Sequence, residues 1–187
     1  DLHRLIRRQR QMCIRDSFST DPFMYEQKEV IDSSLKIVRR LSEENIPCSI
    51  LTKGILPREL ANCSKKNEYG ITIVTLDEEY RKIAEPGAAS IRDRIGALRY
   101  LKEKGYKTWV SIEPFPTPNI HAEDLMDILE AVSFVDKIIF GRLHYNKKVS
   151  EYKNYKEYYN KCAEKVISFC EKNDIEYHIK NGTISEL

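Results

Sequence analysis

Charged and hydroxyl side chains recur just after the short apolar runs of this sequence, where the ends of strands are expected. The stretch "STDPF" places Ser19, Thr20 and Asp21 before a proline, and "LTKG" places Lys53 beside a glycine that allows close backbone approach. An ammonium group at a strand end suits a carboxylate or a phosphate. Structural interpretations stay open as well: "STDPF" could cap a helix that begins near Tyr25, and Lys53 could be a solvated loop lysine.

The stretch "EPGAASIRDRI" places arginines in the first turns of an expected helix, with Ser90 as its N-cap. A basic residue there opposes the helix dipole at a cost of roughly a few tenths of a kcal/mol. Arg94 therefore calls for an anionic partner, which could be a ligand, Asp93 or Glu85.

The stretch "SIEPFPTPN" holds Glu113 at an expected strand end, followed by three prolines within five residues. Such a loop is stiff, and it either positions a ligand or merely connects two elements. His121 is expected to begin the next helix, and His144 follows the next strand. Because the four histidines show no ligand spacing such as HxxxH, no metal site is predicted from them.

The elements that must position these residues alternate between helices and strands. Apolar runs predict strands at 48–52, 70–76, 108–112, 137–140 and 176–179, with a further strand end at 18–20. Residues with helical spacing separate them, which predicts right-handed βαβ units and a parallel sheet. No glycine-rich dinucleotide or phosphate-binding fingerprint follows any strand, which removes the commonest nucleotide sites of open sheets. The polar residues that recur after the strands instead favour a barrel with one site built from many strands.

Composition excludes several classes of protein. The 31 basic and 29 acidic residues nearly balance, so nucleic acid is a possible partner that the charge does not support. No apolar run approaches the roughly 18 residues that span a bilayer. The five cysteines are an odd number without paired spacing, as expected of reduced thiols, and a cytoplasmic location is predicted.

The order of "TDPF", "ILTKG", "ITIVTLD", "EPGAASIRDRI" and "IEPFPTP" resembles the radical S-adenosylmethionine enzymes of the spore-photoproduct-lyase-like, or DNA-repair-photolyase-like, group. The resemblance implies an α/β fold with a partial (βα)₆ TIM-like barrel. It also implies a [4Fe–4S] cluster, S-adenosylmethionine as a small-molecule cosubstrate, and an electron donor. In that group, reductive cleavage of the cosubstrate gives a 5′-deoxyadenosyl radical.

The resemblance also assigns cosubstrate-binding residues, whereas no catalytic residue is predicted. Ser19, Thr20 and Asp21 match the motif that faces the methionine moiety. Lys53 and Thr72 match contacts to its carboxylate or ribose, Arg94 matches the family arginine, and Glu113 matches a strand end near the adenosine.

The sequence departs from the family in one respect: no cysteines are spaced as CxxxCxxC. The chain as written is therefore expected to bind no cluster and to be inactive by itself. Residues 1–17 are predicted to be a non-native leader, because "RQRQMCIRDS" resembles translated sequencing-adapter read-through. Residues 18–187 are then the C-terminal portion of a radical enzyme core, with a barrel incomplete at its N-terminus.

Two other functions stay open. One is a degenerate, non-catalytic barrel that binds a nucleotide-like ligand or a protein partner. The other is an ordinary α/β barrel enzyme in which Glu113, Lys53 and His144 carry out acid–base chemistry.

Overall fold

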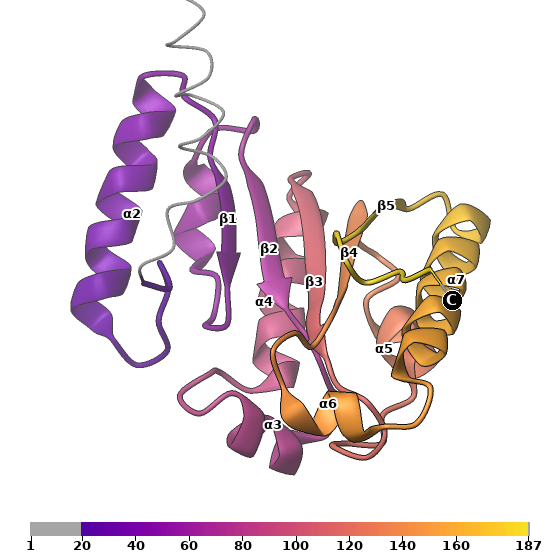
Figure 1. Cartoon of the computed structure of the whole chain (residues 1–187). Coiled ribbons are helices and arrows are strands. Elements are labelled where there is room, and N and C mark those ends of the chain that lie inside the picture. The colour runs from indigo at the N-terminus through magenta and orange to yellow at the C-terminus, as the bar shows by residue number, and fades with distance from the viewer. Residues whose placement is uncertain (1–19, 187) are drawn as a thin grey trace, which may run out of the picture.

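The computed structural model describes residues 20–186, so Ser19 and the predicted leader at 1–17 lie outside the described residues. Its centre is a five-stranded, all-parallel sheet in the order β1-β2-β3-β4-β5 (Figure 1). The strands are β1 (Ser49–Thr52), β2 (Glu68–Thr72), β3 (Lys107–Phe115), β4 (Lys137–Arg142) and β5 (Glu176–Ile179). A sequential order without reversal is that of a (βα) barrel wall, whereas a doubly wound sheet reverses its order. The predicted fold class is confirmed.

Helices connect the strands; the longer ones cover one side of the sheet, and two short ones lie near the carboxyl ends of the strands (Figure 1). The helices are α2 (Lys28–Glu43), the 3₁₀ helix η1 (Arg58–Asn62), α3 (Glu78–Ala84), α4 (Ile91–Glu103), α5 (Leu125–Ala131), α6 (Lys147–Glu151) and α7 (Tyr155–Lys172). The short helices α3 and α6 were not expected from the sequence. Both begin at an Asp or Asn N-cap, Asp77 and Asn146, whose side chain accepts a backbone N–H.

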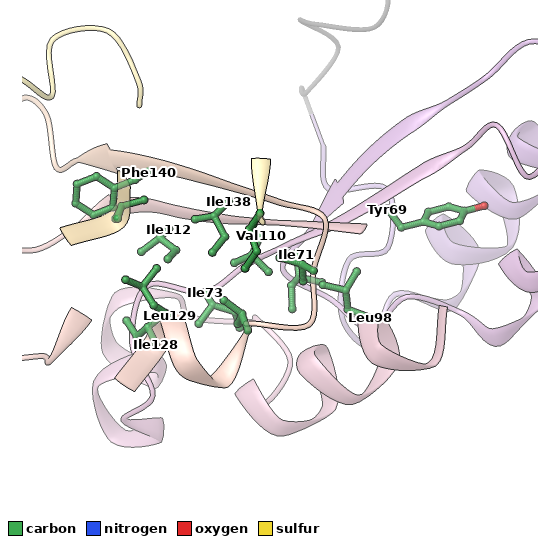
Figure 2. Packing of buried hydrophobic residues seen from close by; sticks show 14 of the residues in the cluster. Tyr69, Ile71, Ile73, Leu98, Val110, Ile112, Ile128, Leu129, Ile138 and Phe140 are labelled. Atoms are coloured by element: carbon green, nitrogen blue, oxygen red, sulfur yellow. The ribbon is translucent and has the colours of Figure 1, made fainter. Parts of the chain in front are cut away.

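The core lies between the sheet and these helices, as Figure 2 shows for Ile71, Val110 and Ile138. All three are fully buried, together with Leu98 on α4 and Leu129 on α5. Burying each such side chain stabilises the fold by roughly 1.5–3 kcal/mol. This layer fixes the strands and therefore the edge at which they end, which we call the carboxyl edge.

Alternate residues of the strands face away from the helices. The register places Gly70, Trp109, Lys137 and Glu176 in one row across four strands. A Cβ atom on Gly70 would lie 2.4 Å from the Trp109 ring, so only glycine allows the indole to lie on β2. Toward the amino ends of the strands, Lys107 and Lys137 both pair with Glu176, at 3.4 and 2.8 Å.

Two expected strand boundaries are wrong. β2 ends at Thr72 rather than at residue 76, although Ile73 and Val74 stay buried, which explains why their apolar pattern is typical of a strand. β3 continues to Phe115, with an irregular register after Ile112 and a cis Glu113–Pro114 peptide bond. Glu113 therefore lies inside β3 and not in a loop after it.

Two expected helix starts are also wrong. α2 begins at Lys28, and the expected helix start at His121 lies in a loop, because Asp124 is the N-cap of α5. Thr20 lies in a bend, and the rest of the expected strand end at 18–20 lies outside the described residues. Among the helices of residues 20–186, none is long and apolar enough to span a membrane.

Candidate functional site

Asp21 ties the segment before α2 to the end of β1. Its Oδ1 accepts hydrogen bonds from the Phe23 N–H, at 2.9 Å, and from the Thr52 hydroxyl, while Oδ2 accepts from the Lys53 N–H at 2.7 Å. The N-cap of α2 is Gln27, which makes no side-chain cap bond, so the helix-cap interpretation of this stretch is wrong. The Asp21 carboxylate instead fixes the backbone that carries Lys53.

Gly54 allows two chain segments to approach closely. A Cβ atom at this position would lie 1.7 Å from the carbonyl oxygen of Phe23, which no side chain could tolerate. The Gly54 N–H donates to the Thr52 hydroxyl at 2.8 Å, and the Phe23 ring is fully buried beside it. The motifs "DPF" and "TKG" are therefore one packed unit that presents Lys53 at the carboxyl edge.

Glu85 holds two cations at this edge. The Lys53 ammonium nitrogen lies 3.2 Å from its Oε1, and Nη1 of Arg94 lies 2.9 Å from its Oε2. The same Arg94 nitrogen donates to the Thr72 carbonyl at 2.7 Å. The Lys53 side chain is 44% exposed, whereas Glu85 and Arg94 are 3% and 1% exposed. Of these three charges, only the Lys53 ammonium is open to a ligand.

The anionic partner that Arg94 requires in the first turns of α4 is therefore Glu85. Asp93, the other candidate within the chain, is engaged by the N-cap: the Ser90 hydroxyl donates to its carboxylate at 2.7 Å. A buried pair of this kind costs several kcal/mol of desolvation, and the loss of one partner leaves the other charge unpaired. The pair thus locks α4 to the end of β2.

Glu113 stands apart from this group on β3. Its Oε2 lies 3.2 Å from the Lys180 ammonium, and its side chain is 27% exposed. A Cβ atom on Gly141 would lie 2.8 Å from the Glu113 carboxyl carbon, so the carboxylate rests on the backbone of β4. Within residues 20–186, no hydrogen bond or ion pair joins Glu113 to Glu85 or its partners.

A third polar group, absent from the sequence prediction, centres on Glu123. Its Oε2 accepts from the Thr75 hydroxyl and lies 2.9 Å from Nε2 of His121, while its Oε1 accepts from the Leu76 N–H at 3.1 Å. The His121 ring stacks on Tyr80 with 3.8 Å between ring centroids. These contacts fasten the loop after β3 to the loop after β2. An acid beside a histidine in a polar loop was the only signal in the sequence.

The thiols of the described residues lie away from the carboxyl edge. Cys48 precedes β1, Cys63 follows η1, and Cys162 and Cys170 are buried on α7. Burial raises the pKa of both α7 thiols to about 11, whereas the ligands of an iron–sulfur cluster are thiolates. Nor do residues 20–186 contain a group of three or more His, Cys, Asp or Glu that could hold a metal ion. The described residues do not fit an iron–sulfur cluster.

The structure thus gathers most of the predicted cosubstrate residues. Asp21, Lys53, Arg94 and the Thr72 carbonyl meet around the ends of β1 and β2. Thr20 is exposed, and Ser19 lies outside the described residues. The roles of all these residues toward a cosubstrate stay predictions.

Comparison with protein families identifies a match over the described strands and helices up to α5. A model described as the Radical SAM superfamily matches residues 17–132, more than half of the chain. An uncharacterized protein, ORF301, of the Acidianus two-tailed virus is 28% identical over 146 residues. That match covers 73% of this chain and 48% of the viral protein, so the chain spans about half the length of this curated relative.

Solved structures share the fold. SuiB from Streptococcus suis bound to S-adenosylmethionine has a TM-score of 0.57 at 18% identity, over 86% of this chain and 36% of SuiB. A spore photoproduct lyase variant with bound AdoMet and dinucleoside spore photoproduct has a TM-score of 0.57 at 13% identity, over 84% of this chain and 57% of the lyase. At these identities the likeness concerns the fold alone.

Proposed function

The chain belongs to the Radical SAM superfamily, and on that premise we propose that it binds S-adenosylmethionine at the carboxyl edge of its sheet. The complete protein would then act in reductive cleavage of this cosubstrate and in 5′-deoxyadenosyl radical chemistry. The observation that carries the proposal is the half-exposed Lys53 ammonium, held at the end of β1 by Glu85 and by the backbone bonds to Asp21.

In this proposal, Lys53 binds the carboxylate of the cosubstrate. Its ammonium is exposed enough to exchange part of its interaction with Glu85 for a second carboxylate. Arg94 is too buried to reach a ligand, so it acts by positioning Glu85 and the end of β2. Glu113 is proposed to face the adenosine, as its place on β3, against the backbone of β4, and its partial exposure allow.

The test is cosubstrate binding by the chain and by Lys53→Gln, measured by isothermal titration calorimetry. We expect the substitution to weaken S-adenosylmethionine binding about tenfold, because a charge-assisted contact to the carboxylate is lost. Binding of 5′-methylthioadenosine, which lacks the amino-acid carboxylate, should stay unchanged. Lys161→Gln is the matched control, since Lys161 is also ion-paired, at 2.7 Å from Glu157, but lies on α7.

Two results would contradict this role. Equal loss of both ligands in Lys53→Gln would mean that the lysine supports the fold and not the carboxylate. Equal loss of S-adenosylmethionine binding in Lys161→Gln would mean that only net charge matters.

The second candidate is a non-catalytic barrel that binds a nucleotide-like ligand or a protein partner. The placement of the thiols favours it, since those of Cys48, Cys63, Cys162 and Cys170 lie away from the carboxyl edge. Anaerobic reconstitution of the complete protein with iron and sulfide, followed by dithionite, separates the two candidates, because only the first predicts release of 5′-deoxyadenosine from S-adenosylmethionine. We expect this chain to release no 5′-deoxyadenosine from S-adenosylmethionine, and its release would refute the expectation.

Family membership also bears on partners and location. A complete enzyme of this superfamily would need an electron donor, and we propose one as a partner of the complete protein. The cytoplasmic location and a nucleic-acid partner stay predictions.

A further inference from the structure

A cavity of about 170 Å³ lies at the carboxyl end of β4, away from the Glu85 group. Its polar lining residues are Arg142, His144, Tyr145, Asn146, Lys147, Ser150 and Tyr155. Three of these carry basic side chains, and no carboxylate is among the residues that line it in the described chain. The lining can therefore carry only positive charge at neutral pH, whereas the whole chain has nearly equal numbers of basic and acidic residues.

The guanidinium group of Arg142 retains free hydrogen-bond donors. Its Nε–H donates to Nδ1 of His144 at 3.3 Å, and its centre lies 6.0 Å from the centroid of the Tyr155 ring. Within residues 20–186 no carboxylate lies within 4.0 Å of Arg142, and its two terminal NH₂ groups donate to no other described residue. Because Nδ1 of His144 accepts this bond, the neutral imidazole carries its proton on Nε2 and offers one more donor.

The backbone that carries these side chains is fixed. The Arg142 N–H donates to the buried Thr183 hydroxyl at 3.4 Å, and the Leu143 N–H donates to the Tyr159 hydroxyl at 3.3 Å. The Tyr159 hydroxyl in turn donates to the Phe115 carbonyl at 2.8 Å. Burial raises the pKa of Tyr159 to about 12, so it keeps this proton at neutral pH. Donors held in this way lose little entropy when a ligand binds.

We propose that this cavity is an anion subsite that binds a phosphoryl group of the substrate. It deepens the proposed function, because the cavity lies at the carboxyl edge where the cosubstrate is placed. A phosphoryl group carries about −1.5 to −2 charge and three acceptor oxygens, which suits a guanidinium, an ammonium and an imidazole N–H. A carboxylate, with one charge and two oxygens, would leave donors of this lining unused.

The test is a titration of the full chain with inorganic phosphate, followed by NMR of the Arg142 Nε–H and the His144 ring. We expect saturable shifts of both signals. Arg142→Gln should weaken phosphate binding about tenfold or more, as loss of a charge-assisted bidentate contact predicts. Lys147→Gln, an exposed position where folding is not at risk, should weaken it about threefold.

Arg92→Gln is the matched control. Arg92 is an exposed arginine in the first turn of α4, so its substitution removes the same charge far from the cavity. Phosphate affinity should stay unchanged in this variant. Methyl phosphate should then bind more tightly than dimethyl phosphate, because only the monoester has the second charge and the third free oxygen that this lining suits.

Three outcomes would overturn the proposal: no phosphate-dependent shift at Arg142 and His144, equal weakening by Arg92→Gln and Arg142→Gln, or acetate binding as tight as phosphate binding. The phosphate titration contains no S-adenosylmethionine. Failure of cosubstrate binding at Lys53 and failure of the anion subsite are therefore separate results.

Discussion

Two arginines at the carboxyl edge occupy opposite environments. Arg94, beside the ends of β1 and β2, is 1% exposed, and its Nη1 contacts both Glu85 and the Thr72 carbonyl. Arg142, the last residue of β4, is partly exposed, and its guanidinium donates to Nδ1 of His144 and to no carboxylate of the described residues. The same residue type is thus part of the interior in one place and part of a cavity wall in the other.

The difference separates the parts of the edge that hold the fold from the parts that can hold a ligand. Around β1 and β2, the charges of Glu85 and Arg94 satisfy each other, and only Lys53 extends toward solvent. At β4, the basic groups have no carboxylate in the cavity lining, so their electrostatic free energy improves only when an anion arrives. Substitutions around the ends of β1 and β2 should therefore mainly lower stability, whereas substitutions at the end of β4 should mainly weaken the binding of an anion.

The largest expected effect is that of Glu85→Gln. It leaves the Arg94 charge buried without a counter-ion, which should lower the free energy of unfolding by about 3 kcal/mol. Chemical denaturation followed by circular dichroism measures this change. Glu79→Gln is the matched control on α3, because the Glu79 carboxylate is 80% exposed in its pair with Lys82 and should cost less than about 0.5 kcal/mol.

A double variant, Glu85→Gln with Arg94→Met, tests the reason for this loss. It should be more stable than Glu85→Gln alone, since no buried charge is then left unpaired. If Glu85→Gln costs no more than Glu79→Gln, the buried pair does not hold this half of the edge together, and the contrast with Arg142 fails.

The sequence predicted the fold better than it predicted the contacts at the edge. The parallel sheet followed from apolar runs such as 137–140, which lies within β4, because burial against helices forces that pattern locally. That Arg94 needs an anion also followed from its place in a helix's first turns. The sequence did not show which anion pairs with Arg94. Glu85 reaches Arg94 because of the turn between α3 and α4, and that turn is a tertiary feature.

The parts of the site that the sequence missed depend on contacts between distant loops. Glu123 lies 48 residues from Thr75, and no local pattern marks such a pair. The expected end of strand β2 was wrong for a related reason: Ile73 and Val74 are buried although they have left the sheet. An apolar pattern indicates that residues are buried, but it does not indicate which neighbouring element buries them.

A smaller effect is expected from acid. Burial of the Glu78 carboxyl is outweighed by its bonds to Arg81 and to the Ile91 N–H, so its pKa is lowered in the folded chain. The stabilisation is present above the unfolded pKa and is lost as the pH falls below about 4.5. Since the Glu78 side chain is 40% exposed, solvent screening limits this loss to less than about 1 kcal/mol.

Denaturation of Glu78→Gln between about pH 6 and pH 3 checks this expectation. The wild-type chain should lose stability relative to the variant on acidification, so that the gap between them narrows. A gap that stays constant over this range would mean that Glu78 contributes through packing, and not through its charge.

The smallest expected effect on stability is that of Arg142→Gln. This variant tests most directly whether Arg142 differs from Arg94. Because the Arg142 charge has no carboxylate partner within residues 20–186, its removal should change the free energy of unfolding by less than about 0.5 kcal/mol. Added phosphate should then raise the melting temperature of the wild-type chain, since a ligand that binds only the folded state stabilises it, and should raise that of the variant less. Thermal denaturation with and without phosphate measures both. A loss as large as that of Glu85→Gln would instead make Arg142 a structural residue like Arg94, and the two halves of the carboxyl edge would then be alike.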